Sequence, residues 1–323
     1  MKKVVLATVA AISLSAGSAL AADMPVKAVP VVAAPAWDIA FGSALTSDYL
    51  FRGITQSNHR PSVNAYFEPR YNINKDNQLY VGIAGNSISF PNNAAAEIDI
   101  YGGWRPTVGK FAFDFGGWYY WYPGGQCFNT AALCNAFGGG PAVAAGLPLN
   151  ANVIKQNLSF AEFYAKVTYN VTDAFALGFA FNYSPSVLNS GAPGYYYNGN
   201  AKYTFAALSN GITPYVSGQV GYWSLGTSDA FYGTATFPNG IKYVSYTHWD
   251  AGFGWSWKVF SVDLRYSGTN LNKGDCNAFT SDHTGTGTTN VTAINPTGVG
   301  SNWCGSRFFA TLKADLTVQQ NLK

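Results

Sequence analysis

Regular alternation of large apolar residues with small or polar ones is the feature that most constrains how this chain folds. From Phe175 to Tyr183, a large apolar side chain occupies every second position. The same period of two recurs in residues 111–116, 161–169 and 260–267. Because successive side chains of a β-strand point to opposite faces, these segments predict strands with one apolar face and one polar face.

Twelve strands result when this pattern is followed from residue 37 onward. The predicted ranges are 37–49, 62–71, 79–88, 97–105, 111–121, 158–170, 174–184, 195–206, 213–224, 243–257, 260–268 and 307–318. Most approach the roughly 9–11 residues that a tilted strand needs to cross a bilayer. Every odd-numbered connection is longer than its neighbours. This sorting predicts an all-β, up-and-down antiparallel transmembrane barrel over residues 37–323, because a soluble β-sandwich has no reason to sort loop lengths by parity.

The composition agrees with a barrel. Charged residues make up 11% of the chain, against about 25% in soluble domains, yet the mean hydropathy is only +0.01. No apolar run beyond the N-terminus is long enough to predict a transmembrane helix. A barrel reconciles these facts because only alternate residues need to be apolar. The small net charge of +3 gives no reason to expect a nucleic-acid partner.

The N-terminus has the layout of a secretory signal peptide. Lys2-Lys3 forms the positive end, Val4 to Ala16 is apolar, and Ala19-Leu20-Ala21 is a small-x-small cleavage site. The apolar stretch is too short to span a membrane as an anchor. We therefore expect residues 1–22 to be removed and residues 23–36 to form a proline-rich periplasmic lead-in. The mature chain would then enter the outer membrane of a Gram-negative bacterium.

Four cysteines in an exported chain favour disulfides, because the export route is oxidising. We expect Cys127 to pair with Cys134 and Cys276 with Cys304, since each pair falls in one of the two longest predicted loops. No C-x-x-C sequence occurs and the three histidines are scattered, so we expect neither a metal site nor a bound cofactor.

In a membrane barrel, the apolar face of each strand meets lipid and the polar face lines the interior. The strand phase then places eight acidic and six basic residues inside: Glu68, Arg70, Glu97, Asp99, Arg105, Asp114, Glu162, Lys166, Lys202, Asp250, Asp263, Arg265, Lys313 and Asp315. Two interpretations follow: a hydrated channel wall whose charges set the ion preference, or a closed interior filled by ion pairs. We favour the channel and expect it to be narrow, because twelve strands lie between filled and wide barrels.

Aromatic residues gather where the predicted strands end. The clusters are Trp118 to Tyr122, Tyr195 to Tyr197, Tyr222-Trp223, and Trp255 with Trp257. Such positions are typical of the aromatic girdles at the two membrane interfaces, with ordinary β-propensity as the alternative explanation.

Three segments carry a resemblance to a known family: Ser47-Asp48-Tyr49-Leu50-Phe51-Arg52-Gly53-Ile54-Thr55-Gln56-Ser57, Glu97 to Trp104, and Phe113 to Gly124. Over about the first seven strands, the chain resembles the TorF family of proteobacterial outer-membrane porins. The resemblance implies a channel without a cofactor, an assigned substrate or catalytic residues. Two features depart from the family pattern. The cysteine-bearing loops look longer, and the chain ends on Asn321-Leu322-Lys323 instead of an aromatic residue, although the alternation continues to Leu322.

Independently of the resemblance, the residues that close the first predicted strand carry their own expectations. Tyr49 and Phe51 are expected to anchor the outer membrane interface. Arg52 falls at or just beyond the strand end. It would line the mouth of the barrel or bind lipopolysaccharide phosphate, and a solvated loop arginine is the alternative.

We expect a passive channel for ions and small hydrophilic solutes that contacts outer-membrane lipid and lipopolysaccharide; the sequence does not indicate an oligomeric state. A non-conducting barrel, structural or presenting residues 272–305 to a partner, is the alternative. An outer-membrane hydrolase would need a nucleophile and a base in reach of each other. His248 is the only histidine in a predicted strand and shares the interior phase with Asp250. We expect both to belong to a polar interior and expect no enzymatic activity.

Overall fold

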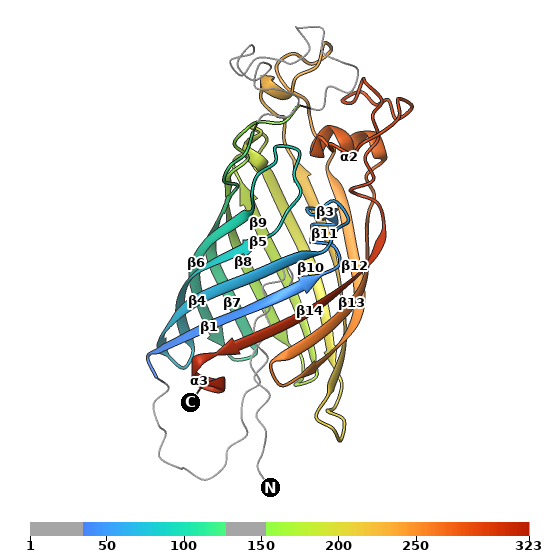
Figure 1. Ribbon diagram of the computed structural model, residues 1–323. Helices are drawn as coiled ribbons and strands as arrows, with labels where there is room; N and C mark the ends of the chain where they lie inside the picture. The colour runs from blue at the N-terminus through green and yellow to red at the C-terminus, as the bar shows by residue number, and fades with distance from the viewer. Residues whose placement is uncertain (1–34, 127–152, 323) are drawn as a thin grey trace, which may run out of the picture.

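The computed structural model describes residues 35–126 and 153–322, and twelve antiparallel strands close into a barrel (Figure 1). The barrel strands are β1 (Trp37–Thr46), β4 (Ser62–Asn74), β5 (Asn77–Asn86), β6 (Glu97–Val108), β7 (Phe111–Trp121), β8 (Phe160–Asn170), β9 (Phe175–Ser184), β10 (Gly194–Thr204), β11 (Thr213–Leu225), β12 (Tyr246–Trp257), β13 (Phe260–Thr269) and β14 (Arg307–Thr317). Strands that follow one another in the chain are neighbours, and β1 closes the ring by pairing with β14. The predicted twelve-stranded up-and-down barrel is confirmed.

The short turns and the long loops lie at opposite ends of the barrel (Figure 1). The turns are residues 75–76, 109–110, 171–174, 205–212 and 258–259. The loops are residues 47–61, 87–96, 122–126 with 153–159, 185–193, 226–245 and 270–306. We call these two ends the turn end and the loop end. In barrels of this type, the turn end faces the periplasm and the loop end faces the outside.

The chain departs from the predicted strands mainly where it changes direction. β1 ends at Thr46 and not at residue 49, because the following loop turns into the barrel. β14 ends at Thr317, whose hydroxyl caps the short helix α3 (Val318–Asn321) by accepting a hydrogen bond from Gln320 N. Gln319 N in α3 then donates to Asp38 Oδ1 at 3.0 Å. The alternation that reaches Leu322 therefore does not extend the strand.

Large apolar side chains cover the outside of the barrel. Val81 is 63% exposed and Phe163 is 60% exposed, and similar residues occur on every barrel strand. Exposing such a surface to water is unfavourable in free energy, whereas contact with lipid acyl chains is favourable. A transmembrane barrel places its apolar band against these chains. Among the described residues, no helix is long and apolar enough to cross a membrane.

The aromatic clusters at strand ends divide between the two faces of the sheet. The outward members are Tyr119, Trp121, Tyr195, Tyr197, Tyr222, Trp255 and Trp257, all exposed. Five rings that we expected in the girdles face the interior instead: Tyr120, Tyr122, Tyr196 and Trp223, which are buried, and Trp118, which borders an interior cavity and stacks on buried Tyr101. The girdle interpretation is wrong for those five, because the period of two that puts one ring at the interface puts the next ring inside.

Interior tyrosines lie over glycines of the adjacent strand. A Cβ atom added to Gly82 would lie 2.2 Å from Cζ of Tyr101, and one added to Gly116 would lie 2.5 Å from the hydroxyl of Tyr164. Only glycine leaves room for these rings, so part of the chain's high glycine content serves interior packing.

In the described parts of the loops lie three short helices: η2 (Val187–Asn189), η3 (Ala230–Tyr232) and α2 (Lys273–Thr280). The α2 helix carries Cys276, which forms a disulfide with Cys304 across a separation of 28 residues. This pairing confirms the prediction for the last loop. The predicted pair Cys127–Cys134 lies outside the described residues.

Candidate functional site

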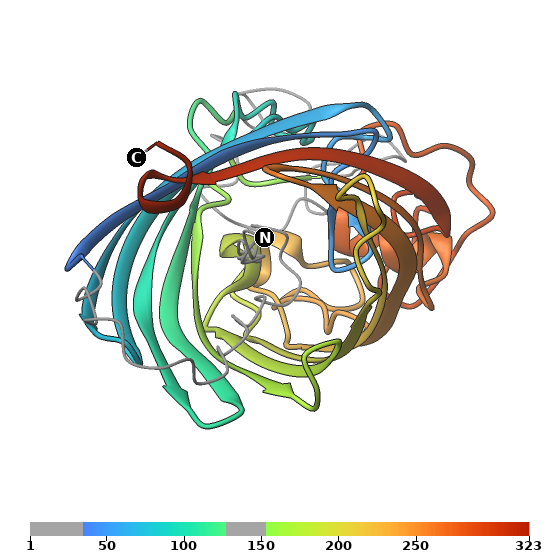
Figure 2. The same ribbon diagram turned by 90° about the horizontal axis from the view of Figure 1, so that it is seen from below.

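The first long loop folds into the barrel. Residues 47–61, which we call the inner loop, contain a hairpin of β2 (Leu50–Phe51) and β3 (Ile54–Thr55). Viewed from below, this blue hairpin lies inside the ring of strands (Figure 2). Its turn residues Arg52 and Gly53 have φ values of 50° and 80°, the two positive values that a type I′ turn requires. A Cβ on Gly53 would lie 2.6 Å from Cγ2 of Thr269, so only glycine lets the hairpin approach the wall this closely.

Arg52 connects the inner loop to the far side of the barrel. Its Nη2 donates to Oε2 of Glu162 on β8 at 2.7 Å, and both side chains are almost fully buried, 4% and 1% exposed. The rings of Tyr196, Trp223 and Phe51 surround the guanidinium, with centroids 4.0, 4.2 and 4.6 Å from Cζ. Arg52 is therefore neither a solvated loop residue nor placed to bind lipopolysaccharide phosphate. It holds the hairpin across the lumen.

Tyr49 and Phe51 also point inward, so the expectation that they anchor the membrane interface is wrong. The Tyr49 hydroxyl donates to Oε1 of Glu97 at 2.6 Å. The Phe51 ring packs edge-on against Tyr120 and Trp223, with centroids 5.7 Å apart in each pair. The physical reason is the turn after Thr46. After that turn the chain is no longer part of the barrel wall, so the alternation of residues does not tell which side chains face the membrane.

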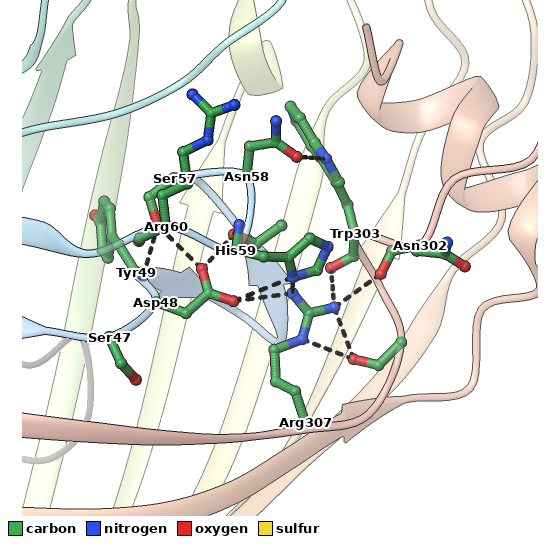
Figure 3. Close-up of polar contacts among 12 residues, drawn as sticks. Ser47, Asp48, Tyr49, Ser57, Asn58, His59, Arg60, Asn302, Trp303 and Arg307 are labelled. Carbon is green, nitrogen blue, oxygen red and sulfur yellow. Dashed lines mark hydrogen bonds and ion pairs between the residues drawn. The ribbon is translucent and has the colours of Figure 1, made fainter. Parts of the chain in front are cut away.

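Polar side chains hold the inner loop in its folded position (Figure 3). The Asp48 carboxylate accepts hydrogen bonds from the hydroxyls of Thr55 and Ser57, both in the same loop. Arg307 Nη1, at the start of β14, donates to Asp48 Oδ2 at 3.1 Å and to Nδ1 of His59 at 2.8 Å. We call Asp48, His59 and Arg307 the latch. The hydrogen bond to Nδ1 requires a neutral imidazole, and burial together with the Arg307 charge lowers the pKa of His59, against a smaller opposing effect of Asp48.

The latch joins the inner loop to the last loop. Arg307 Nη2 donates to the carbonyls of Trp303 at 2.7 Å and Gly305 at 2.8 Å. The indole Nε1 of Trp303 donates to Oδ1 of Asn58 at 3.0 Å, and the backbone N of Thr55 donates to the Trp303 carbonyl at 3.1 Å. Residues 302–307 therefore act as the seat on which the inner loop rests.

Each of the six long loops contributes apolar side chains to one buried cluster at the loop end. We call it the cap cluster, and its loop members include Phe51, Ile54, Phe90, Tyr122, Ile154, Leu158, Val187, Tyr232, Ile241, Tyr243 and Trp303. An apolar core of this kind excludes water and stabilises the loops against one another. The outer end of the barrel is therefore packed, whereas its middle is polar.

The fourteen charged residues predicted to face the interior all lie on barrel strands. Several form ion-pair clusters. Glu68 binds Arg70 at 2.6 Å and Arg105 at 2.8 Å, and Arg105 lies 3.4 Å from Asp114. On the other side of the barrel, Arg265 bridges Asp250 at 2.7 Å and Asp263 at 3.1 Å.

The remaining predicted residues are held differently. Glu97 and Asp99 are buried side by side and both accept hydrogen bonds from Asn86 Nδ2, at 2.9 and 3.0 Å. Asp315 accepts from the Tyr66 hydroxyl at 3.1 Å. In the part of the chain that the structure describes, Lys166, Lys202 and Lys313 form no ion pair. That these residues line an open pore stays a prediction.

Below the inner loop lies a cavity with an empty volume of about 1400 Å³, including space open to solvent. We call it the lumen cavity. Residues from both sides of the barrel line it, among them Arg52, Lys166, Asp250, Arg265 and Lys313. The charged interior is therefore not completely filled by side chains.

His248 and Asp250 both lie in the interior, as predicted, but they do not form a pair. His248 Nε2 is 2.8 Å from the Tyr196 hydroxyl. Asp250 instead accepts hydrogen bonds from Arg265 at 2.8 Å and from Gln219. No described group of three or more His, Cys, Asp or Glu side chains is arranged to hold a metal ion.

Sequence reasoning missed the inner loop and its latch. One signal was present: Arg52-Gly53, between the apolar residues Phe51 and Ile54, has the glycine that a tight hairpin turn needs. The partners Glu162 and Arg307 lie far along the chain, and no local pattern connects them to that turn.

The closed ring of strands, the apolar outside and the charged interior define a membrane-spanning β-barrel of the outer-membrane type. Residues 32–295 match the profile of a family described as "Bacterial protein of unknown function (Gcw_chp)". Because the match spans most of the sequence, the chain belongs to this family. No curated protein matches the chain. The resemblance to the TorF family is not confirmed and stays a prediction.

Several solved structures are similar in fold. An outer-membrane channel from Pseudomonas putida F1 is 9% identical with a TM-score of 0.44, the match covering 91% of this chain and 100% of that one. The NanC porin is 8% identical with a TM-score of 0.41, covering 86% and 98%. LpxR from Salmonella typhimurium is 9% identical with a TM-score of 0.39, covering 86% and 99%. At identities and TM-scores this low, these likenesses carry no argument about activity.

Proposed function

We propose that this protein is an outer-membrane channel through which ions and small hydrophilic solutes diffuse passively. The observation that carries the proposal is the lumen cavity, a space of about 1400 Å³ bordered by charged and amide side chains inside an apolar shell. Charged groups at such a boundary are stable only if water, solute or a paired group meets them. A hydrated passage supplies the first two.

The inner loop is the constriction of this channel. Its hairpin lies within the ring of strands, and the Arg52–Glu162 ion pair connects it to β8 on the far side from β1. Solutes moving between the loop end and the lumen cavity have to pass it. The conductance should therefore depend on how firmly the hairpin is held.

Planar-bilayer recording tests the proposal. We would compare the refolded wild-type barrel with a variant in which residues 50–55 are replaced by a Gly-Ser linker of equal length. A matched control replaces residues 206–211, in a turn at the opposite end, with the same linker. We expect discrete conductance steps for all three proteins and a larger step only for the inner-loop variant. Correctly folded barrels that stay silent, even without the hairpin, would refute the channel.

A non-conducting barrel is the second candidate, and the cap cluster favours it. Apolar side chains from all six long loops pack over the loop end, and the Cys276–Cys304 disulfide holds the last loop there. A barrel whose role is structural, or which presents residues 272–305 to a partner, needs no open passage. Silence of both the wild-type barrel and the inner-loop variant would support this candidate.

The proposal places the protein in the bacterial outer membrane, delivered by a cleaved signal peptide and in contact with lipid and lipopolysaccharide. The resemblance to TorF porins supports the same location and role. We also propose that it has no enzymatic activity. His248 is hydrogen-bonded to Tyr196 and Asp250 to Arg265, so the two do not form a catalytic pair with each other. Lipid hydrolysis by the purified barrel, abolished by His248→Ala, would overturn that part.

A further inference from the structure

We propose that the lumen cavity binds small organic dicarboxylates, one carboxylate at the ammonium group of Lys166 and the other at that of Lys313. The inference rests on the proposed channel function and names its solute class. Three observations support it: the cavity itself, the two lysines that border it, and the ion-pair partners of the other charged side chains along its wall.

Three of the four acidic residues of the cavity wall are paired with an arginine. Asp48 is bound by Arg307 at 3.1 Å, and Asp250 and Asp263 share Arg265 at 2.7 and 3.1 Å. The fourth acid, Asp99, accepts a hydrogen bond from Asn86 through Oδ2 at 3.0 Å, and its buried Oδ1 has no hydrogen-bond partner among the described residues. The two arginines of the wall, Arg52 and Arg265, are the partners of carboxylates in the same way.

Lys166 and Lys313 are the exception. Within the described residues, neither ammonium group has a carboxylate oxygen within 4.0 Å or a hydrogen-bond partner. Lys166 Nζ lies 4.3 Å from the centroid of the Tyr164 ring, a contact that leaves its three N–H donors available. Among the described residues of the cavity wall, Lys166 and Lys313 are therefore the basic side chains that have no carboxylate partner.

The two lysines come from opposite walls. Lys166 lies on β8 and Lys313 on β14, which are six places apart in the closed order of twelve strands, whichever way round they are counted. Both border the same cavity. Two cations that face one space from opposite sides match a solute with a negative group at each end, better than a monoanion that reaches only one of them.

The outer end of the cavity carries further positive charge. Arg52 borders it, and Nη1 of this buried guanidinium has no hydrogen-bond partner among the described residues. Amide side chains, including Asn182, Asn198 and Gln219, line the rest of the wall. The empty volume of about 1400 Å³ includes space open to solvent, so a short dicarboxylate would occupy the cavity together with water.

Isothermal titration of the detergent-solubilised barrel tests the proposal with succinate, glutarate and adipate as probes. Butyrate serves as the monoanionic control and succinamide as the neutral one. We expect saturable binding of at least one dicarboxylate and at least tenfold weaker binding of both controls. Lys166→Gln and Lys313→Gln should each weaken dicarboxylate binding by about tenfold or more, because each removes one charge-assisted contact. Lys202→Gln is the matched control, since Lys202 faces the interior without bordering this cavity, and it should bind normally.

The outcomes separate this inference from the channel itself. A barrel that conducts ions but binds no dicarboxylate, or binds butyrate equally well, overturns the inference and leaves the channel in place. Equal binding by the Lys166 and Lys313 variants overturns it too, provided that their heat-modifiable migration shows folded barrels. The charge-retaining variant Lys166→Arg should keep most of the binding, and its loss would indicate a merely structural role. Dicarboxylate binding to an electrically silent barrel would support the binding site and refute the channel function.

Discussion

Removing the charge of Glu162 should release the inner loop. Glu162 Oε2 accepts three hydrogen bonds: from Arg52 at 2.7 Å, from Asn182 at 3.2 Å and from Tyr120 at 3.3 Å. The substitution Glu162→Gln keeps the size of the side chain and removes its charge. It leaves the buried guanidinium of Arg52 without its only ion-pair partner among the described residues.

The size of the effect follows from the burial of the pair. Breaking a buried ion pair by removing one partner costs about 3–5 kcal/mol, because the remaining charge stays uncompensated. The rings of Phe51, Tyr196 and Trp223 still surround Arg52 in the variant, so we expect the lower end, about 3 kcal/mol. Since about 1.4 kcal/mol corresponds to a factor of ten, the equilibrium between the seated and released hairpin should shift by about 100-fold.

Single-channel recording measures this shift as the fraction of time spent in the larger conductance state. We expect Glu162→Gln to raise that fraction by about two orders of magnitude over wild type, while the thermal stability of the barrel strands changes little. Asp114→Asn is the matched control. It removes an interior carboxylate that is paired with Arg105 and does not contact the inner loop. If Glu162→Gln stays within about threefold of wild type in this fraction, the ion pair does not hold the hairpin and the reasoning fails.

Three further perturbations test the same architecture. Gly53→Ala should displace the hairpin, because the positive φ and the wall 2.6 Å from the new Cβ both oppose it, and single-channel conductance should rise. Reduction of the Cys276–Cys304 disulfide should destabilise the last loop by about 3–4 kcal/mol, measured as faster protease cleavage within residues 270–306, for a closed loop of 28 residues' separation. Protonation of His59 should weaken the latch. Because the folded pKa of His59 is lowered, its contribution is present above about pH 6.5 and is lost as the pH falls below that value. The open fraction should therefore rise between pH 8 and pH 5 in wild type, and a His59→Asn variant with the same pH response would contradict this assignment.

The barrel could be predicted from the sequence because its physical rule is local. A strand that faces lipid on one side and a polar interior on the other needs an apolar residue at every second position, and residues such as Phe175 to Tyr183 record that rule directly. The same phase predicts that the fourteen charged residues face the interior. Strand phase specifies the face of the sheet and nothing more, so it could not distinguish an ion-paired residue such as Arg105 from an unpaired one such as Lys166.

The inner loop could not be predicted in this way because its contacts join distant parts of the chain. Tyr49, Phe51 and Arg52 continue the apolar and polar alternation of the first strand, and this continuity suggested a longer strand with interfacial residues. They point inward to partners more than forty residues away: Glu97, Glu162 and Trp223. The Arg52-Gly53 turn indicates a hairpin, but the position of that hairpin depends on the residues against which it packs, and these are distant in the sequence.

The unpaired interior lysines bear on whether the barrel conducts. A closed interior gains most when each buried charge has a partner, since leaving an ion without compensation costs several kcal/mol in a dry environment. The clusters around Arg105 and Arg265 meet that condition, but Lys166, Lys202 and Lys313 have no ion-pair partner within the described residues. An ammonium group without a carboxylate keeps its charge only where water or solute reaches it, and the cavity beside Lys166 and Lys313 would give both of them that access. A packed cap and a hydrated middle would be compatible in one protein if its inner loop moved, which is the condition that the Glu162→Gln experiment examines.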